Sequence, residues 1–256
     1  MKEKQMLNIV VPMAGAGSRF AVAGYKDPKP LIPVHGVPMI KVVIDNLTPA
    51  CEHRFIFICQ AAHVEAYGLQ EKLQAWAPGC AIVELDGLTE GAACTVYAAR
   101  ELINSDDPVM IANSDQYVDI DINDYLRSME VQQADGLIMT MKADDPKWSF
   151  VGFDEAGRID RVIEKEVISD EATVGIYNFR SGRELIAAIE SMFDKDLRVN
   201  GEFYVAPAYN EMIGDDARIV HYSIGSEGAG MYGLGIPADL DLFLGLSVSQ
   251  AATAGR

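Results

Sequence analysis

The residues best suited to chemistry lie near the start of the chain, in the stretch VVPMAGAGSRFAVAGYKDPKPLIPVHGVPMIK, residues 10–41. An apolar strand that runs into the glycine-rich turn GAGSR and then a helix presents backbone N–H groups suited to an anionic phosphate. Ten residues after Arg19 comes Lys29, whose flanking prolines Pro28 and Pro30 bias the backbone to extended geometry. We therefore expect these two cations to converge on a triphosphate.

The charge distribution supports an anionic small-molecule ligand. The chain carries 38 acidic and 21 basic residues, a net charge of −17, whereas residues 1–41 hold six basic residues against two acidic ones, a local balance of +4. A strongly acidic protein lacks the contiguous basic face that nucleic acid or an anionic membrane would require. The predicted partners are therefore small anions, with no nucleic acid and no membrane.

Other interpretations of the glycine-rich turn are weaker. A dinucleotide-binding fingerprint would need a small residue where Phe20 stands, and the chain has no G-x-x-x-x-G-K-[ST] phosphate loop. If the glycines stood alone, a tight turn that binds no ligand would be an equally good interpretation. The nearby arginine and proline-flanked lysine favour phosphate binding.

A second chemical feature is the segment VMIANSDQYVD, in which Asp115 follows an apolar strand. Ligands of open α/β sheets collect at the carboxyl ends of strands, and a carboxylate there can hold Mg²⁺ together with substrate phosphate oxygens. The alternative for Asp115 is a turn or cap residue. Asp119 and Asp121 form a D-x-D that a glycosyltransferase would use, or equally the solvated start of a helix.

The segment PMAGAGSRF…KPLIPVHGVPMI resembles the sugar-phosphate nucleotidyltransferases, that is, nucleoside-diphosphate-sugar pyrophosphorylases and related cytidylyltransferases. The shared pattern is G-x-G-[ST]-R, then K-P-[LM], then G-x-P-[ML]-[IL], and the resemblance continues in pieces to about residue 240. It implies an NTP and a sugar 1-phosphate or other small phosphomonoester as substrates, pyrophosphate as product, Mg²⁺ as cofactor, and a role in cell-surface polysaccharide synthesis. It leaves the nucleobase and the acceptor undetermined.

The resemblance also implies roles for individual residues. Two further segments take part: LDGLTEGAACTVYAA resembles a base-contacting element, and VIEKEVISDEATVGIYNF resembles an acceptor-binding element. The expected site comprises catalytic Arg19 and Lys29; nucleotide-binding Met13, Ala14, Gly15, Gly17, Gly91 and Ala92; acceptor-binding Glu164, Lys165, Gly175 and Glu202; and the metal ligand Asp115. Helix packing would explain Ala92 as well, a surface ion pair would explain Glu164 and Lys165, and a favourable helix dipole would explain Glu202.

Two positions depart from the family pattern. Glu166 stands where the family often has proline, and Gly233 in MYGLGIPADL stands where many members carry an aspartate that completes the metal site. The second carboxylate is therefore missing or supplied differently, with Asp239 as a candidate. This departure keeps a non-catalytic nucleotide-sensing module open as an alternative, and the D-x-D at Asp119 keeps open a GT-A-type glycosyltransferase.

The elements that must position these residues follow an α/β pattern. We expect a Rossmann-like, mostly parallel mixed sheet with flanking helices, of the GT-A-like nucleotidyltransferase type, and a β-rich acceptor-binding part. Expected strands are 7–13, 54–59, 80–85, 109–112, 136–142, 148–153, 158–163, 173–179 and 218–223, and expected helices are 38–47, 61–75, 90–104, 122–130, 183–193, 203–213 and one from residue 237. We expect one domain over 1–256, with a nucleotide-binding half (1–134), an acceptor-binding half (135–246) and a frayed tail (247–256).

The remaining features concern location and redox state. Four cysteines lack C-x-x-C spacing, so they predict buried thiols in a reducing compartment rather than a zinc site. The N-terminus lacks the apolar run of a signal peptide, and no later apolar run is long enough to cross a bilayer. We expect a cytoplasmic protein, and the sequence allows a homodimer.

Overall fold

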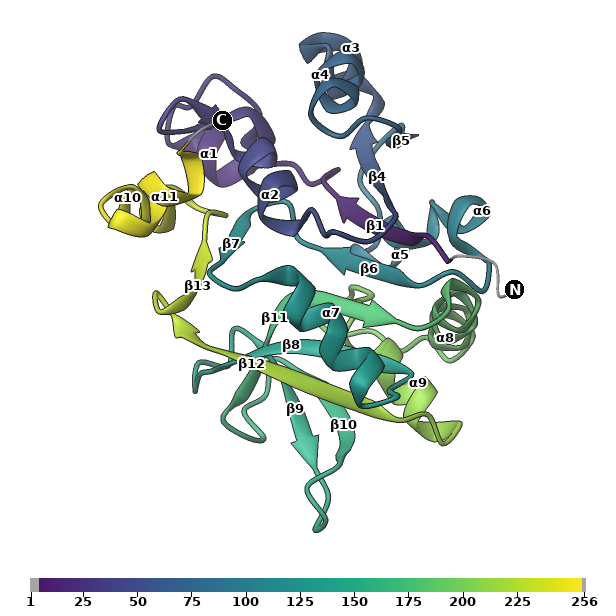
Figure 1. Ribbon diagram of the computed structural model, residues 1–256. Coiled ribbons are helices and arrows are strands. Elements are labelled where there is room, and N and C mark those ends of the chain that lie inside the picture. The colour runs from purple at the N-terminus through teal and green to yellow at the C-terminus, as the bar shows by residue number, and fades with distance from the viewer. Residues whose placement is uncertain (1–4, 255–256) are drawn as a thin grey trace.

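The computed structural model describes residues 5–254 and contains a mixed sheet of 11 strands together with a two-stranded hairpin. At one side of the sheet, β5 (Ala81–Leu85), β4 (His53–Gln60), β1 (Leu7–Pro12) and β6 (Val109–Ala112) run parallel to one another. Parallel strands need crossover connections, which here contain helices. The predicted Rossmann-like α/β fold with flanking helices is confirmed (Figure 1).

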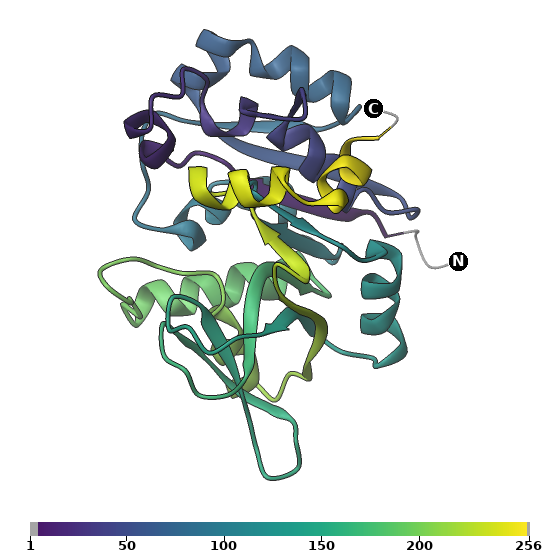
Figure 2. The same cartoon turned by 90° about the vertical axis from the view of Figure 1, so that its left-hand side faces the viewer.

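The second part of the sheet is mixed. Strand β11 (Glu171–Phe179) is antiparallel to β6 and to β8 (Gly136–Lys142), and β12 (Ile219–Glu227) runs parallel to β8. Beyond β12 lie β13 (Gly230–Gly233) and then β7 (Gln116–Val118), antiparallel to β13. Strands β9 (Ser149–Phe153) and β10 (Ile159–Glu164) form a hairpin that projects from the molecule in both views (Figures 1 and 2).

Successive side chains of a strand point to opposite faces of the sheet, so the core has two layers. In β1, Ile9 and Val11 face one cluster of buried side chains and Val10 faces the other, as the two-residue period of a strand requires. The first cluster lies under α2 (Met39–Leu47), α3 (Ala61–Tyr67), α4 (Leu69–Trp76) and α7 (Ile122–Val131). The second lies under α5 (Ala92–Tyr97), α6 (Arg100–Ile103), α8 (Gly182–Asp194) and α9 (Ala208–Gly214).

A third, smaller cluster joins the glycine-rich segment to the C-terminal helices. The N-terminal elements of this cluster are α1 (Ser18–Val22), the 3₁₀ turn η1 (Lys29–Leu31) and the hairpin of β2 (Pro33–Val34) and β3 (Val37–Pro38). The C-terminal elements are α10 (Pro237–Leu244) and α11 (Ser247–Thr253). Phe20 and Ile32 pack in one cluster with Phe243 and Ala252. The C-terminal helices therefore lie against the segment that carries the expected catalytic cations (Figures 1 and 2).

Several expected boundaries were wrong. Residues 247–253 form helix α11 rather than a frayed tail, because Ser249 and Ala252 are buried and Ser249 Oγ is 2.8 Å from His35 Nε2. The last two residues of the expected tail, 255–256, lie outside the described residues.

The other boundary errors arise at turns. The expected helix 61–75 is divided at Gly68, which adopts a left-handed conformation, and the expected helix 90–104 consists of two short helices. The expected helix 203–213 begins only after Pro207, and the short strands β2, β3, β7 and β13 were not expected. None of the helices within residues 5–254 is long and apolar enough to cross a membrane.

Candidate active site

A cavity of about 400 Å³ opens where the chain leaves the carboxyl ends of β1 and β6, and we call it the Lys29 cavity. Open α/β sheets place ligands at such strand ends. Its lining comprises Ala16, Gly17, Ser18, Arg19, Lys29, Asn113, Asp115, Gln116, Trp148, Met231, Gly233, Gly235, Ile236 and Asp239. The fold thus gathers the glycine-rich turn, both expected catalytic cations and the expected metal ligand around one space.

An ion pair joins two of these residues across the cavity. Lys29 Nζ lies 2.8 Å from Asp115 Oδ2, and both side chains are half-buried. The backbone fixes Asp115 from the other side, because its carbonyl accepts a hydrogen bond of 2.8 Å from the N–H of Leu234. A carboxylate at this position can therefore hold a cation, and in the ligand-free chain that cation is the lysine ammonium.

Asp239 is a second carboxylate of the same cavity. Burial raises the pKa of Asp239, and the neighbouring Glu227 and Asp115 carboxylates add to this shift, whereas Lys147 and Arg19 oppose it. The carboxyl group thus lies in a partly desolvated environment that disfavours its charged form.

The expected nucleotide-binding residues of the glycine-rich turn differ in their exposure to solvent. Gly17 lies beside Lys29, and its φ of +60° gives the turn a left-handed conformation that favours glycine. Gly15 is exposed, with open space around its Cα. Met13 and Ala14 are buried beneath the turn, where the Ala14 carbonyl accepts a hydrogen bond of 2.6 Å from Gln60 Nε2.

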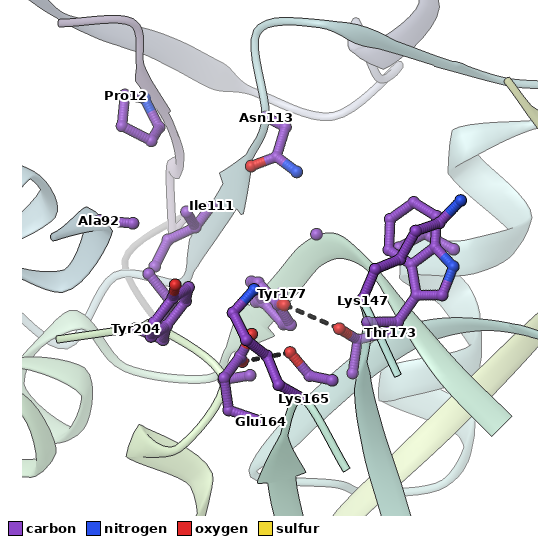
Figure 3. A pocket seen from close by; sticks show the side chains of 16 residues that line it. Pro12, Ala92, Ile111, Asn113, Lys147, Glu164, Lys165, Thr173, Tyr177 and Tyr204 are labelled. Carbon is purple, nitrogen blue, oxygen red and sulfur yellow. Dashed lines mark hydrogen bonds between the residues drawn. The ribbon is translucent and has the colours of Figure 1, made fainter. Parts of the chain in front are cut away.

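A neighbouring cavity of about 260 Å³, the Lys165 cavity, lies over β9, β10 and β11. Its lining comprises Pro12, Ala92, Ile111, Asn113, Lys147, Trp148, Ser149, Glu164, Lys165, Thr173, Val174, Gly175, Tyr177, Tyr204, Val205 and Ala206. Figure 3 shows the Glu164 and Lys165 side chains near the bonded pair Thr173 and Tyr177, whose hydroxyl oxygens are 2.9 Å apart. The structure therefore brings together three of the four expected acceptor residues.

The polar groups of the Lys165 cavity are of two kinds. Burial raises the pKa of Glu164, although a hydrogen bond from the Ser149 hydroxyl and the charge of Lys165 lower it. Lys165 has φ of +60° and places its ammonium 5.2 Å from the centre of the Tyr204 ring. Burial, with a hydrogen bond to Glu202, raises the pKa of Tyr204 to about 12. Glu202 is hydrogen-bonded to Tyr204 and is not itself part of the cavity lining.

The two cavities share Asn113 and Trp148. The Asn113 amide lies directly on Gly175, because a Cβ built on Gly175 would overlap it, and Gly175 has φ of +84°. These contacts make the cavities adjoining compartments of one site.

The base-contacting element is placed differently from expectation. Gly91 has φ of +130° and faces the backbone of Phe203, which a Cβ at position 91 would overlap. Ala92 lines the Lys165 cavity rather than the Lys29 cavity. The close approach to Phe203 therefore requires glycine at position 91, and a base contact of Gly91 stays a prediction.

Trp148, Asn113, Lys147 and Tyr204 were not selected from the sequence. Lys147 and Trp148 follow the turn-rich segment ADDP, whose residues do not indicate a binding or catalytic role. The D-x-D alternative is weakened, since Asp121 is the N-cap of α7 and accepts a hydrogen bond of 2.8 Å from the Asn123 N–H.

The glycine-rich turn, the cation pair and the carboxylate at the carboxyl ends of parallel strands define an α/β enzyme of the nucleotide-binding class, with a second compartment beside the first. The chain belongs to the nucleotidyl transferase family, whose model matches residues 9–200.

Solved structures agree with this assignment. A nucleoside-diphosphate-sugar pyrophosphorylase from Vibrio cholerae RC9 is 26% identical with a TM-score of 0.78, over 92% of this chain and 99% of that one. A UDP-glucose pyrophosphorylase complexed with UDP-glucose shares the fold at 15% identity and a TM-score of 0.74, over 98% and 100% of the two chains. A UTP-bound UGPase from Acinetobacter baumannii shares it at 16% identity and 0.70, over 92% and 90%.

Proposed function

We propose that the enzyme transfers a nucleotidyl group from an NTP to a sugar 1-phosphate or other small phosphomonoester and releases pyrophosphate. The observation that carries this proposal is the pair of adjoining cavities, each with its own lysine, that share Asn113 and Trp148. One lysine suits the triphosphate and the other suits the phosphate of the acceptor.

The Lys29 cavity would hold the triphosphate. An oxygen of the acceptor phosphate forms a bond to the α-phosphorus, and the bond from that phosphorus to the oxygen bridging the β-phosphate breaks. The electron pair leaves on pyrophosphate, so the enzyme has to position the reactants and neutralise charge rather than form a covalent intermediate. Arg19 and Lys29 would stabilise the charge that develops on the pyrophosphate.

The donor set fits Mg²⁺, which binds through one or two carboxylates and substrate phosphate oxygens. Asp115 would hold the ion, and the Lys29 ammonium 2.8 Å from its carboxylate supports a cation-binding role for this position. When bound, Mg²⁺ would supply charge neutralisation at the phosphate oxygens. Lys29 would then exchange its carboxylate partner for the pyrophosphate oxygens.

The Lys165 cavity would hold the acceptor. Lys165 would bind the attacking phosphate, which is already ionised and needs no general base. The free oxygen of Glu164 would accept a hydrogen bond from the organic part, which lies against Gly175. The cavity volume of about 260 Å³ suits a small metabolite.

Pyrophosphate release tests this function. Wild-type enzyme with Mg²⁺ is assayed with CTP, UTP, dTTP, GTP and ATP against sugar 1-phosphates and other small phosphomonoesters, and at least one pairing is expected to release pyrophosphate. With that pairing, Lys165→Met should raise the acceptor KM about tenfold or more, because a charge-assisted hydrogen bond is lost, and should leave the NTP KM within about twofold. Equal effects on both KM values would contradict the assignment of Lys165 to the acceptor.

A further inference from the structure

We propose that Asp239 is the second protein carboxylate of a divalent-cation site that it shares with Asp115 in the Lys29 cavity. The inference rests on the proposed function only for its remaining ligands, which would be phosphate oxygens and water. The two carboxylates themselves are placed by the fold.

The connection between β13 and α10 brings Asp239 to Asp115. Strand β13 ends at Gly233 and α10 begins at Pro237, so three residues separate the strand from the helix. Asp239 lies in the first turn of α10. The same connection is bonded to Asp115 through the Leu234 N–H, which fixes the position of one carboxylate relative to the other.

Two glycines leave space for these carboxylates. A Cβ built on Gly233 would lie 3.3 Å from Asp239 Oδ2, and a Cβ built on Gly235 would lie 2.6 Å from Asp115 Oδ2. A side chain at either position would press on a carboxylate. The alternating glycines at the end of β13 thus allow both acidic groups to reach the same cavity.

One of the two carboxylates of the cavity has no bonded partner. Asp115 has Lys29 as its partner, but no hydrogen bond or ion pair joins the half-buried Asp239 carboxylate to any of residues 5–254. The nearby Glu227 is already paired with Lys147, at 3.0 Å. Partly buried carboxylates without a partner are costly unless a cation or hydrogen-bond donors satisfy them.

Gln116 gives an independent indication of a ligand. Its side chain is 6% exposed and lines the same cavity, yet its Nε2 has no hydrogen-bond partner within the described chain. Buried amide donors are nearly always satisfied, so a ligand oxygen is expected beside it. A phosphate oxygen would accept from this amide while its other oxygens bind a cation on the carboxylates.

The number of acidic ligands agrees with a site completed by substrate. No cluster of three or more His, Cys, Asp or Glu side chains suited to a metal occurs among residues 5–254. Mg²⁺ commonly binds to one or two carboxylates and keeps water and phosphate oxygens as its other ligands. Asp115 and Asp239 supply that number.

Terbium luminescence tests the site without catalysis. Tb³⁺ is a hard cation that binds oxygen ligands, and of the chain's two tryptophans Trp148 lines this cavity and can sensitise the ion. The full chain is titrated with Tb³⁺ under tryptophan excitation. Asp239→Asn should raise the Tb³⁺ dissociation constant about tenfold or more, whereas Asp241→Asn, the same charge loss two residues away on an exposed face of α10, should change it by less than about twofold.

Two further variants test where Tb³⁺ binds and whether it competes with Lys29. Trp148→Phe should abolish most of the sensitised emission while direct excitation still reports bound Tb³⁺, which locates the ion beside Trp148, and the loss of affinity in Asp239→Asn then assigns it to the Lys29 cavity. Lys29→Met should tighten Tb³⁺ binding, because the competing ammonium is removed from Asp115. Thermal unfolding of each variant verifies that it is folded.

The outcomes separate this inference from the proposed function. Equal affinities in Asp239→Asn and Asp241→Asn, or no saturable emission in wild type, would overturn the assignment of Asp239, even if the enzyme releases pyrophosphate. A tenfold loss confined to Asp239→Asn would support the site, and a wild-type enzyme that then released no pyrophosphate would refute only the nucleotidyl-transfer function.

Discussion

Replacing Lys29 by methionine tests whether its ammonium stabilises the transition state. Methionine keeps much of the length of the side chain and removes the charge, and Lys29 is half-buried, so its field is only partly screened by solvent. Loss of one preorganised donor to a developing oxyanion costs about 2.7–4 kcal/mol, or roughly 10²–10³ in kcat. The expected result is a fall of that size in pyrophosphate release at saturating NTP and acceptor.

The same geometry predicts a small effect on stability. The Lys29–Asp115 pair is about one-quarter exposed on both sides, so its loss should cost about 1 kcal/mol and lower Tm by roughly 2–4 °C. Lys26→Met, which removes an exposed charge from the same loop, should change kcat by less than about threefold. A folded Lys29→Met enzyme with turnover equal to that of Lys26→Met would refute the role of Lys29 in catalysis.

Three further predictions concern stability. Gly91→Ala should lower the free energy of unfolding in urea by about 3 kcal/mol or more, because its Cβ would overlap a neighbouring backbone at φ of +130°. Gly24→Ala, at φ of +86° in open space, should lower it by only about 1 kcal/mol. Similar costs for the two variants would contradict the packing role of Gly91. Burial lowers the pKa of His221 from its ordinary 6.5, so the unfolded chain takes up the proton first as pH falls, and stability present above pH 6.5 should be lost below it. His221→Asn should weaken this pH dependence of the unfolding free energy between pH 7.5 and 5.5. An unchanged slope would refute the role of His221. Ala252→Glu should lower Tm because it buries a charge, whereas the exposed Ala251→Glu should not, and equal Tm values would show that α11 does not stabilise the fold.

Sequence reasoning identified the parts of the site that depend on local pattern. Arg19, Lys29 and Asp115 each follow a strand or a proline-bounded turn, and such features can be recognised within about ten residues. The ion pair between Lys29 and Asp115 spans 86 positions in the chain, so only the folded structure shows that one binds the other in the absence of ligand.

Features that depend on tertiary packing could not be predicted from the sequence. The sequence around Gly91 resembles a base-contacting element, but it does not indicate that the backbone of Phe203 lies against this glycine. Trp148 was expected only as the first residue of a strand, and its local sequence does not indicate that it lines two adjoining cavities. Helix α11 was missed because its few apolar residues gain stability only from the cluster they join.

The contact between the N-terminal turn and the C-terminal helices constrains how the enzyme can be made. His35 and Ser249 are 214 residues apart in sequence, and Phe20 shares its cluster with Phe243 and Ala252. During translation the parallel strands can pair while the ribosome is still adding the second half of the chain, but the support beneath Lys29 is absent until residues near 252 emerge. A nascent chain is therefore expected to pair its N-terminal parallel strands early and to fix the Lys29 segment last.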